Sequence, residues 1–175
     1  MHVDTKKVAA AGLLVAFSVI LIWLSSLIET SSLFFIAAAS FCVGIAIREW
    51  GIRLGFAFLI ASFLVNLFVT PQKMYCFTFV GMGFYIWFSE WLYRLLGDKR
   101  DVKHRKVWLW TGKIICFNIM YIPVLFFAPQ ILFQGRVNGL FAMIFLFLGQ
   151  VVLYVYDVAY RYFQSQVWGK IRNKG

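Results

Sequence analysis

The chain has 175 residues, of which 62% are hydrophobic and 14% charged, and its net charge is +10. Soluble domains use about 45–50% apolar and about 25% charged residues, so this composition excludes an ordinary water-soluble fold. It predicts one compact helical domain, residues 1–175, for which the lipid bilayer acts as solvent.

Six apolar runs follow one another along the chain. At about 1.5 Å per residue, roughly 20 residues cross a hydrocarbon core of about 30 Å. The expected spans are residues 8–28, 33–49, 54–70, 74–96, 107–128 and 139–163. The first run is too long for the apolar region of a cleavable signal peptide, so we interpret it as the first span. The predicted fold class is therefore all-α, an integral membrane bundle of six transmembrane helices.

Basic residues are distributed unequally between the segments that connect these runs. Fourteen Lys and Arg residues fall on one side of the predicted membrane, against two, Lys73 and Arg136, on the other. Because basic residues accumulate in cytoplasmic loops, this count predicts a multi-pass protein of the bacterial inner membrane with both termini in the cytoplasm. The basic residues then contact membrane lipids, and nucleic acid is not expected as a partner.

The sequence predicts neither a metal site nor a cofactor. Cys42, Cys76 and Cys116 lie singly in apolar runs, and His2 and His104 fall in polar segments, so no set with metal-ligand spacing forms. The motifs of zinc proteases, serine hydrolases and nucleotide-binding loops are missing from the sequence. We therefore expect that the protein is not an enzyme.

Charged residues inside the expected spans lie toward the predicted cytoplasmic ends. Glu90 and Arg94 stand four residues apart, as do Asp157 and Arg161, and this spacing predicts two ion pairs within helices. Lys113 is six positions inside the fifth span and is expected to extend toward the interface. We expect no acid or histidine at mid-membrane, which argues against a proton- or sodium-coupled carrier.

Uncharged polar residues lie nearer the middle of the expected spans. Asn118 and Gln150 each stand eleven residues into a span, and Asn66 lies in the outer half of another. Buried amides need partners, so they either join neighbouring helices or line a cavity. The candidates for a substrate pocket open to the outside are Asn66, Lys73, Tyr75, Asn118, Tyr121 and Gln150.

The first run carries small residues on one helical face. Ala9, Gly12 and Ala16 are spaced by three and four residues, and such a face lets another helix approach closely. The approaching helix belongs either to the same chain or to another protein.

In its length, its six runs, its Lys6-Lys7 start and its alanine- and glycine-rich first helix, the chain resembles the substrate-binding S components of energy-coupling factor (ECF) transporters. In that family an alanine-x-x-x-alanine motif on the first helix docks on a shared transmembrane coupling subunit. The matching residues are Gly12 and Ala16, with glycine in place of the first alanine and Ala9 extending the face.

This resemblance implies a subunit of an ATP-dependent importer that captures a vitamin-like micronutrient from the extracellular side. It also implies a transmembrane coupling subunit and ATPase subunits as partners. Two alternatives remain open on the residues alone. One is a non-transporting membrane scaffold or assembly protein, and the other is a small lipid-modifying enzyme or flippase.

Overall fold

The computed structural model describes residues 5–97, 105–127 and 139–168, and all regular elements within these ranges are helices. The all-α prediction is confirmed for this part of the chain. The basic segments at 98–104 and 169–175, and Arg136, lie outside the described residues. The chain divides into two compact units, Met1–Asp98 and Lys99–Gly175, and each is described by itself. The single domain expected from the sequence stays a prediction.

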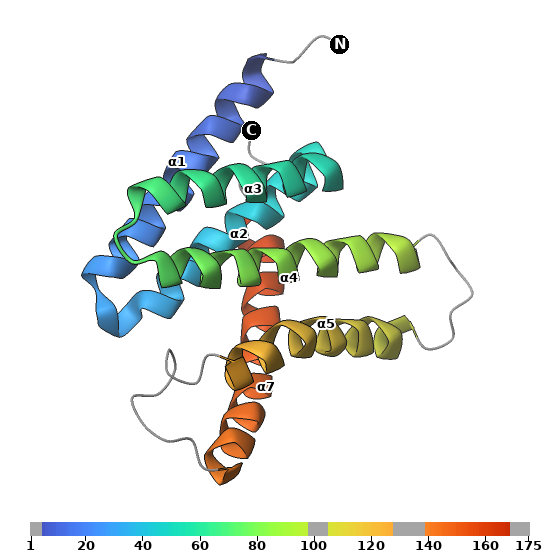
Figure 1. Cartoon of the computed structure of the whole chain (residues 1–175). Coiled ribbons are helices and arrows are strands. Elements are labelled where there is room, and N and C mark those ends of the chain that lie inside the picture. The colour runs from blue at the N-terminus through green and yellow to red at the C-terminus, as the bar shows by residue number, and fades with distance from the viewer. Residues whose placement is uncertain (1–4, 98–104, 128–138, 169–175) are drawn as a thin grey trace. The chain divides into compact units, whose positions relative to one another are not determined.

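The first unit contains four long helices (Figure 1). They are α1 (Thr5–Leu27), α2 (Ser32–Trp50), α3 (Ile52–Val69) and α4 (Lys73–Gly97), with the 3-10 turn η1 (Glu29–Ser31) between the first two. Gly51 separates α2 from α3 and has a φ of 91°. Because side chains disfavour this backbone conformation, a glycine suits the sharp turn between these helices.

Two glycines let the helices of the first unit approach closely. A Cβ atom added to Gly83 of α4 would lie 2.6 Å from Leu59 of α3 and 3.3 Å from Val43 of α2. A Cβ atom at Gly55 of α3 would overlap the Ile47 side chain and lie 3.0 Å from its Cα atom. Three helices therefore pack closely at these two glycines, and at Gly55 an added side chain would also press on the backbone of α2.

The second unit contains α5 (Arg105–Phe127) and α7 (Gly139–Tyr162), which continues as the short π-helix η2 (Phe163–Trp168). The two long helices cross, and do not lie along each other for their full lengths (Figure 1). Where they meet, the Trp110 ring of α5 stacks on the Tyr154 ring of α7, with the ring centroids 5.7 Å apart.

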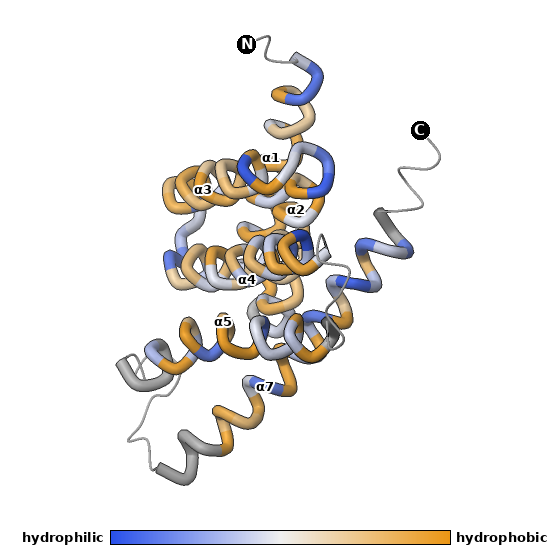
Figure 2. Tube along the Cα trace, turned by 90° about the vertical axis from the view of Figure 1, so that its right-hand side faces the viewer, coloured by the Kyte–Doolittle hydropathy of each residue, from blue (hydrophilic) through white to orange (hydrophobic). Residues whose placement is uncertain are grey.

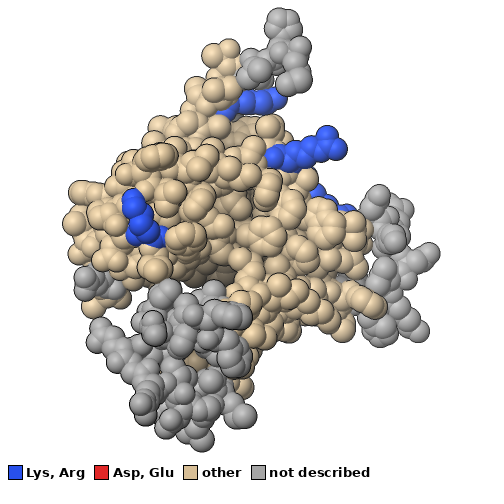
Figure 3. Space-filling model, in the orientation of Figure 1, with Lys and Arg blue, Asp and Glu red and all other residues tan. Residues whose placement is uncertain are grey.

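Apolar helices dominate both units. Four helical segments have the length and composition to cross a membrane: Thr5–Leu27, Ser32–Trp50, Ile52–Val69 and Ile144–Gln166. In the described part of the chain α4 and α5 are not among them, although they have 25 and 23 residues. Hydrophobic stretches extend along the helices of each unit (Figure 2), and the described surface in Figure 3 is mainly uncharged, with scattered Lys and Arg side chains. These features indicate a membrane protein, whereas the bacterial inner membrane and the orientation of the termini remain predictions.

Candidate functional site

The small-residue face of α1 is exposed. Ala9, Gly12 and Ala16 are all exposed, and a Cβ atom added to Gly12 would meet no other atom within 4 Å. The amino-terminal turns of α1 project beyond the other helices of the first unit (Figure 1, Figure 2). The helix packs inside its unit through a different set of residues, Ser18, Ile22 and Ser25, which are buried. No described part of the first unit covers the small-residue face, so packing within this unit does not account for it.

The three pocket candidates of the first unit make mainly local contacts. The Asn66 side chain is fully buried and donates from Nδ2 to the Ser62 carbonyl oxygen at 2.7 Å. Lys73 Nζ donates to two carbonyl oxygens at the end of α3, of which that of Thr70 lies 3.0 Å away. Tyr75 is half-buried in the first turn of α4. Lys73 thus satisfies carbonyl groups that every helix leaves unpaired at its last turn.

The three candidates of the second unit join two helices. Gln150 Nε2 of α7 donates to Asn118 Oδ1 of α5 at 2.8 Å, and Tyr121 Oη donates to the Phe145 carbonyl oxygen at 2.9 Å. A Cβ atom at Gly149 would lie 2.6 Å from the Tyr121 ring, so the glycine makes room for it. Of the two roles considered for the buried amides, these contacts match the bonding of neighbouring helices.

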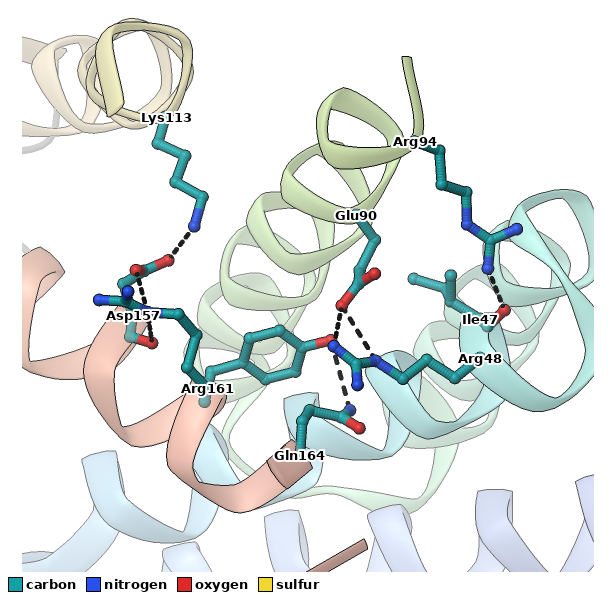
Figure 4. Close-up of polar contacts among 9 residues, drawn as sticks. Ile47, Arg48, Glu90, Arg94, Lys113, Asp157, Arg161 and Gln164 are labelled. Atoms are coloured by element: carbon teal, nitrogen blue, oxygen red, sulfur yellow. Dashed lines mark hydrogen bonds and ion pairs between the residues drawn. The ribbon is translucent and has the colours of Figure 1, made fainter. Parts of the chain in front are cut away.

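A cluster of three charged side chains lies further along the same helix pair (Figure 4). Lys113 Nζ lies 2.5 Å from Asp157 Oδ1, and Arg161 Nε lies 3.0 Å from Asp157 Oδ2. We call Lys113, Asp157 and Arg161 the ion cluster. The ion pair expected between Asp157 and Arg161 is confirmed. Lys113, which was expected to extend toward the interface, binds a carboxylate of the neighbouring helix, and its depth in a membrane stays a prediction.

The amide pair of this unit contained a signal for the ion cluster that the sequence reasoning missed. Lys113 precedes Asn118 by five residues, and Asp157 follows Gln150 by seven. If the two helices are antiparallel, a contact between Asn118 and Gln150 brings Lys113 and Asp157 to the same end of the helix pair. An amide pairing assumed from the start would therefore have predicted the ion pair.

A second buried carboxylate, Glu90 of α4, binds a residue from another helix (Figure 4). Its Oε1 atom accepts from Arg48 of α2, at 3.0 Å from Nη2 and 3.2 Å from Nε. Arg94, expected to pair with Glu90, instead donates from Nη2 to the Ile47 carbonyl oxygen at 2.9 Å. That carbonyl also accepts from the Gly51 backbone N–H at 2.9 Å, so Arg94 adds a second hydrogen bond at the end of α2.

Among the described residues, no group of three or more His, Cys, Asp and Glu side chains could hold a metal ion. Comparisons with protein-family models, with curated proteins and with solved structures give no match. The geometry of the chain's own residues therefore carries the functional argument.

Proposed function

We propose that this chain is the substrate-capture subunit of an ATP-dependent importer, of the type to which ECF S components belong. In this role it binds a vitamin-like micronutrient from outside and docks on a separate transmembrane coupling subunit that works with ATPase subunits. The observation that carries the proposal is the exposed face formed by Ala9, Gly12 and Ala16 on α1.

The physical argument concerns how helices associate in lipid. Acyl chains cover apolar side chains as well as another helix does, so the hydrophobic effect does not drive association inside the bilayer. Close packing does drive it, and small residues allow the closest approach. Val8 and Leu13, at the borders of the small-residue face, are large and exposed. The face is thus a shallow strip between larger side chains, which suits the ridge of a partner helix.

The buried carboxylates fit a subunit that leaves energy coupling to another protein. Glu90 is held by Arg48, and Asp157 by Lys113 and Arg161. Carriers driven by protons or sodium usually use an intramembrane acid that changes its charge or its partner during transport. Carboxylates in ion pairs between helices serve packing, which agrees with energy supplied by ATPase subunits.

The second candidate function is the non-transporting scaffold, and one observation favours it. Asn118, Gln150 and Tyr121 bond helices to one another, and Lys73 holds the end of α3. Polar residues with such roles need no small-molecule ligand. A scaffold would use the same face of α1 to hold a partner.

Co-purification with matched variants tests the proposal. The double variant Gly12→Leu/Ala16→Leu fills the small-residue face, and Ala57→Leu/Ala61→Leu makes the same change at exposed positions of α3. We expect wild type and the α3 variant to retain a transmembrane partner, its ATPase and a bound small molecule. The α1 variant should lose both proteins but keep the small molecule.

The outcomes of this experiment separate the two candidates. A partner held through α1 without an ATPase or a bound small molecule would favour the scaffold. Equal losses in both double variants would show that the small-residue face has no special role. Thermal unfolding of each purified variant checks that all of them fold.

A further inference from the structure

The ion cluster of the second unit contains one more positive charge than negative. Asp157 is only 1% exposed, whereas the side chains of Lys113 and Arg161 are 14% and 55% exposed. One carboxylate neutralises one of the two cations. The cluster therefore keeps a net charge of about +1 beside an apolar helix surface, where an uncompensated charge is unfavourable.

The surplus charge is presented by Arg161. Its Nε atom lies 3.0 Å from Asp157 Oδ2 and 3.4 Å from the Asp157 carbonyl oxygen, so this edge of the guanidinium is occupied. Among the described residues, no acceptor binds its two terminal nitrogens. Since a guanidinium offers paired donors in one plane, its open edge matches two oxygens of a phosphate group.

The surroundings of the ion cluster place it near a membrane interface. Arg161 lies five residues before the end of the apolar segment Ile144–Gln166, and its long side chain can reach the headgroup level. Trp110 lies beside it, with its ring centroid 5.8 Å from both Lys113 Nζ and Arg161 Cζ. Tryptophan is enriched at the interface between lipid and water.

We infer that the ion cluster binds the phosphate of an anionic phospholipid headgroup. Arg161 donates to the phosphate oxygens, and Lys113 adds positive charge from α5. Asp157 fixes the orientation of both cations through its two carboxylate oxygens. The headgroup supplies the negative charge that the cluster lacks, and Trp110 packs against the same region of the lipid. This inference does not depend on the proposed function.

Nanodiscs made with and without phosphatidylglycerol in phosphatidylcholine provide the test. Lipid retained by the full-length protein is measured by native mass spectrometry, and Tm by tryptophan fluorescence. We expect wild type to retain phosphatidylglycerol preferentially and to have a higher Tm in its presence. Arg161→Gln should weaken this preference about fivefold, the effect expected for one basic residue near the membrane surface. The matched control Arg53→Gln removes an exposed arginine of α3 outside the ion cluster and should weaken the preference less than Arg161→Gln does.

A change at Asp157 separates lipid binding from a purely structural cluster. Asp157→Asn removes the only negative charge of the cluster. Phosphate binding predicts a stronger preference for phosphatidylglycerol, by about fivefold, even if the variant is less stable in phosphatidylcholine. A structural role alone predicts the same loss of Tm in both lipids and an unchanged preference, which would overturn the inference.

Inorganic phosphate added to phosphatidylcholine nanodiscs distinguishes the two sources of the phosphate group. A rise in Tm equal to that with phosphatidylglycerol, and lost in Arg161→Gln, would identify a soluble phosphate as the occupant and contradict lipid binding. If phosphatidylglycerol raises the Tm and inorganic phosphate does not, the result supports binding of the lipid headgroup.

Discussion

The two units hold their helices together by different combinations of close packing and polar bonds. In a bilayer the hydrophobic effect does not hold one helix against another, so close packing or polar bonds must do so. In the first unit Gly83 and Gly55 bring three helices close together, and the Arg48–Glu90 ion pair joins two of them. In the second unit polar bonds are more prominent, among them the Asn118–Gln150 amide pair and the Lys113–Asp157 ion pair, beside the close contact at Gly149. Close packing and polar bonds predict different effects when their residues are substituted.

The largest effect is expected from filling a contact of the first unit. In Gly55→Val the added atoms collide with the Ile47 side chain and press on its Cα atom, and overpacking of this kind costs about 3 kcal/mol of unfolding free energy. Thermal or denaturant unfolding in detergent measures the loss. Gly12→Val is the matched control, because its side chain meets open space and the stability should stay unchanged. Equal losses at the two positions would show that close packing is not what holds this unit.

The next effect concerns the ion pair of the second unit. Lys113→Met leaves Asp157 buried with Arg161 as its ion-pair partner, and we expect a loss of about 2 kcal/mol. Lys113→Met/Asp157→Asn removes both charges and should restore about half of it, because no negative charge then remains buried between the two helices. Unfolding of these two variants, of the single variant Asp157→Asn and of wild type gives the coupling between the residues. Additive losses would contradict a direct interaction.

The smallest effect is expected at the amide pair. Gln150→Leu removes one bond between α5 and α7, and such bonds in membrane proteins contribute about 0.6 kcal/mol on average. Asn118→Leu/Gln150→Leu should be no less stable than the single variant, since the two amides lose the same bond. If the double variant lost twice as much unfolding free energy as the single variant, each amide would have an independent partner, such as a bound ligand.

The sequence predicts local features of this chain better than contacts between its helices. Each expected apolar run lies on a helix, because hydropathy and span length depend on neighbouring residues. The Asp157–Arg161 pair could also be predicted, because its four-residue spacing is a property of one helix. Arg48–Glu90 and Lys113–Asp157 could not be derived this way. Their partners depend on which helices touch and how they cross, and for Lys113–Asp157 the only signal in the sequence is an assumed pairing of Asn118 with Gln150.

The small-residue face has one property that the sequence predicts and one that it does not. The spacing of Ala9, Gly12 and Ala16 was readable from the sequence, but whether the face packs inside the chain was not. The structure shows that the other helices of the first unit leave this face exposed.

Photo-crosslinking from α1 in native membranes is the most direct test of the proposed docking role. Leu13 is 76% exposed beside the small-residue face, and Phe68 is 85% exposed on α3, so both positions accept a photoreactive phenylalanine analogue. We predict that the analogue at position 13 crosslinks to a transmembrane protein that co-purifies with an ATPase, whereas the analogue at position 68 does not. Crosslinks from position 13 to lipid alone, or to the same proteins that position 68 captures, would contradict the account.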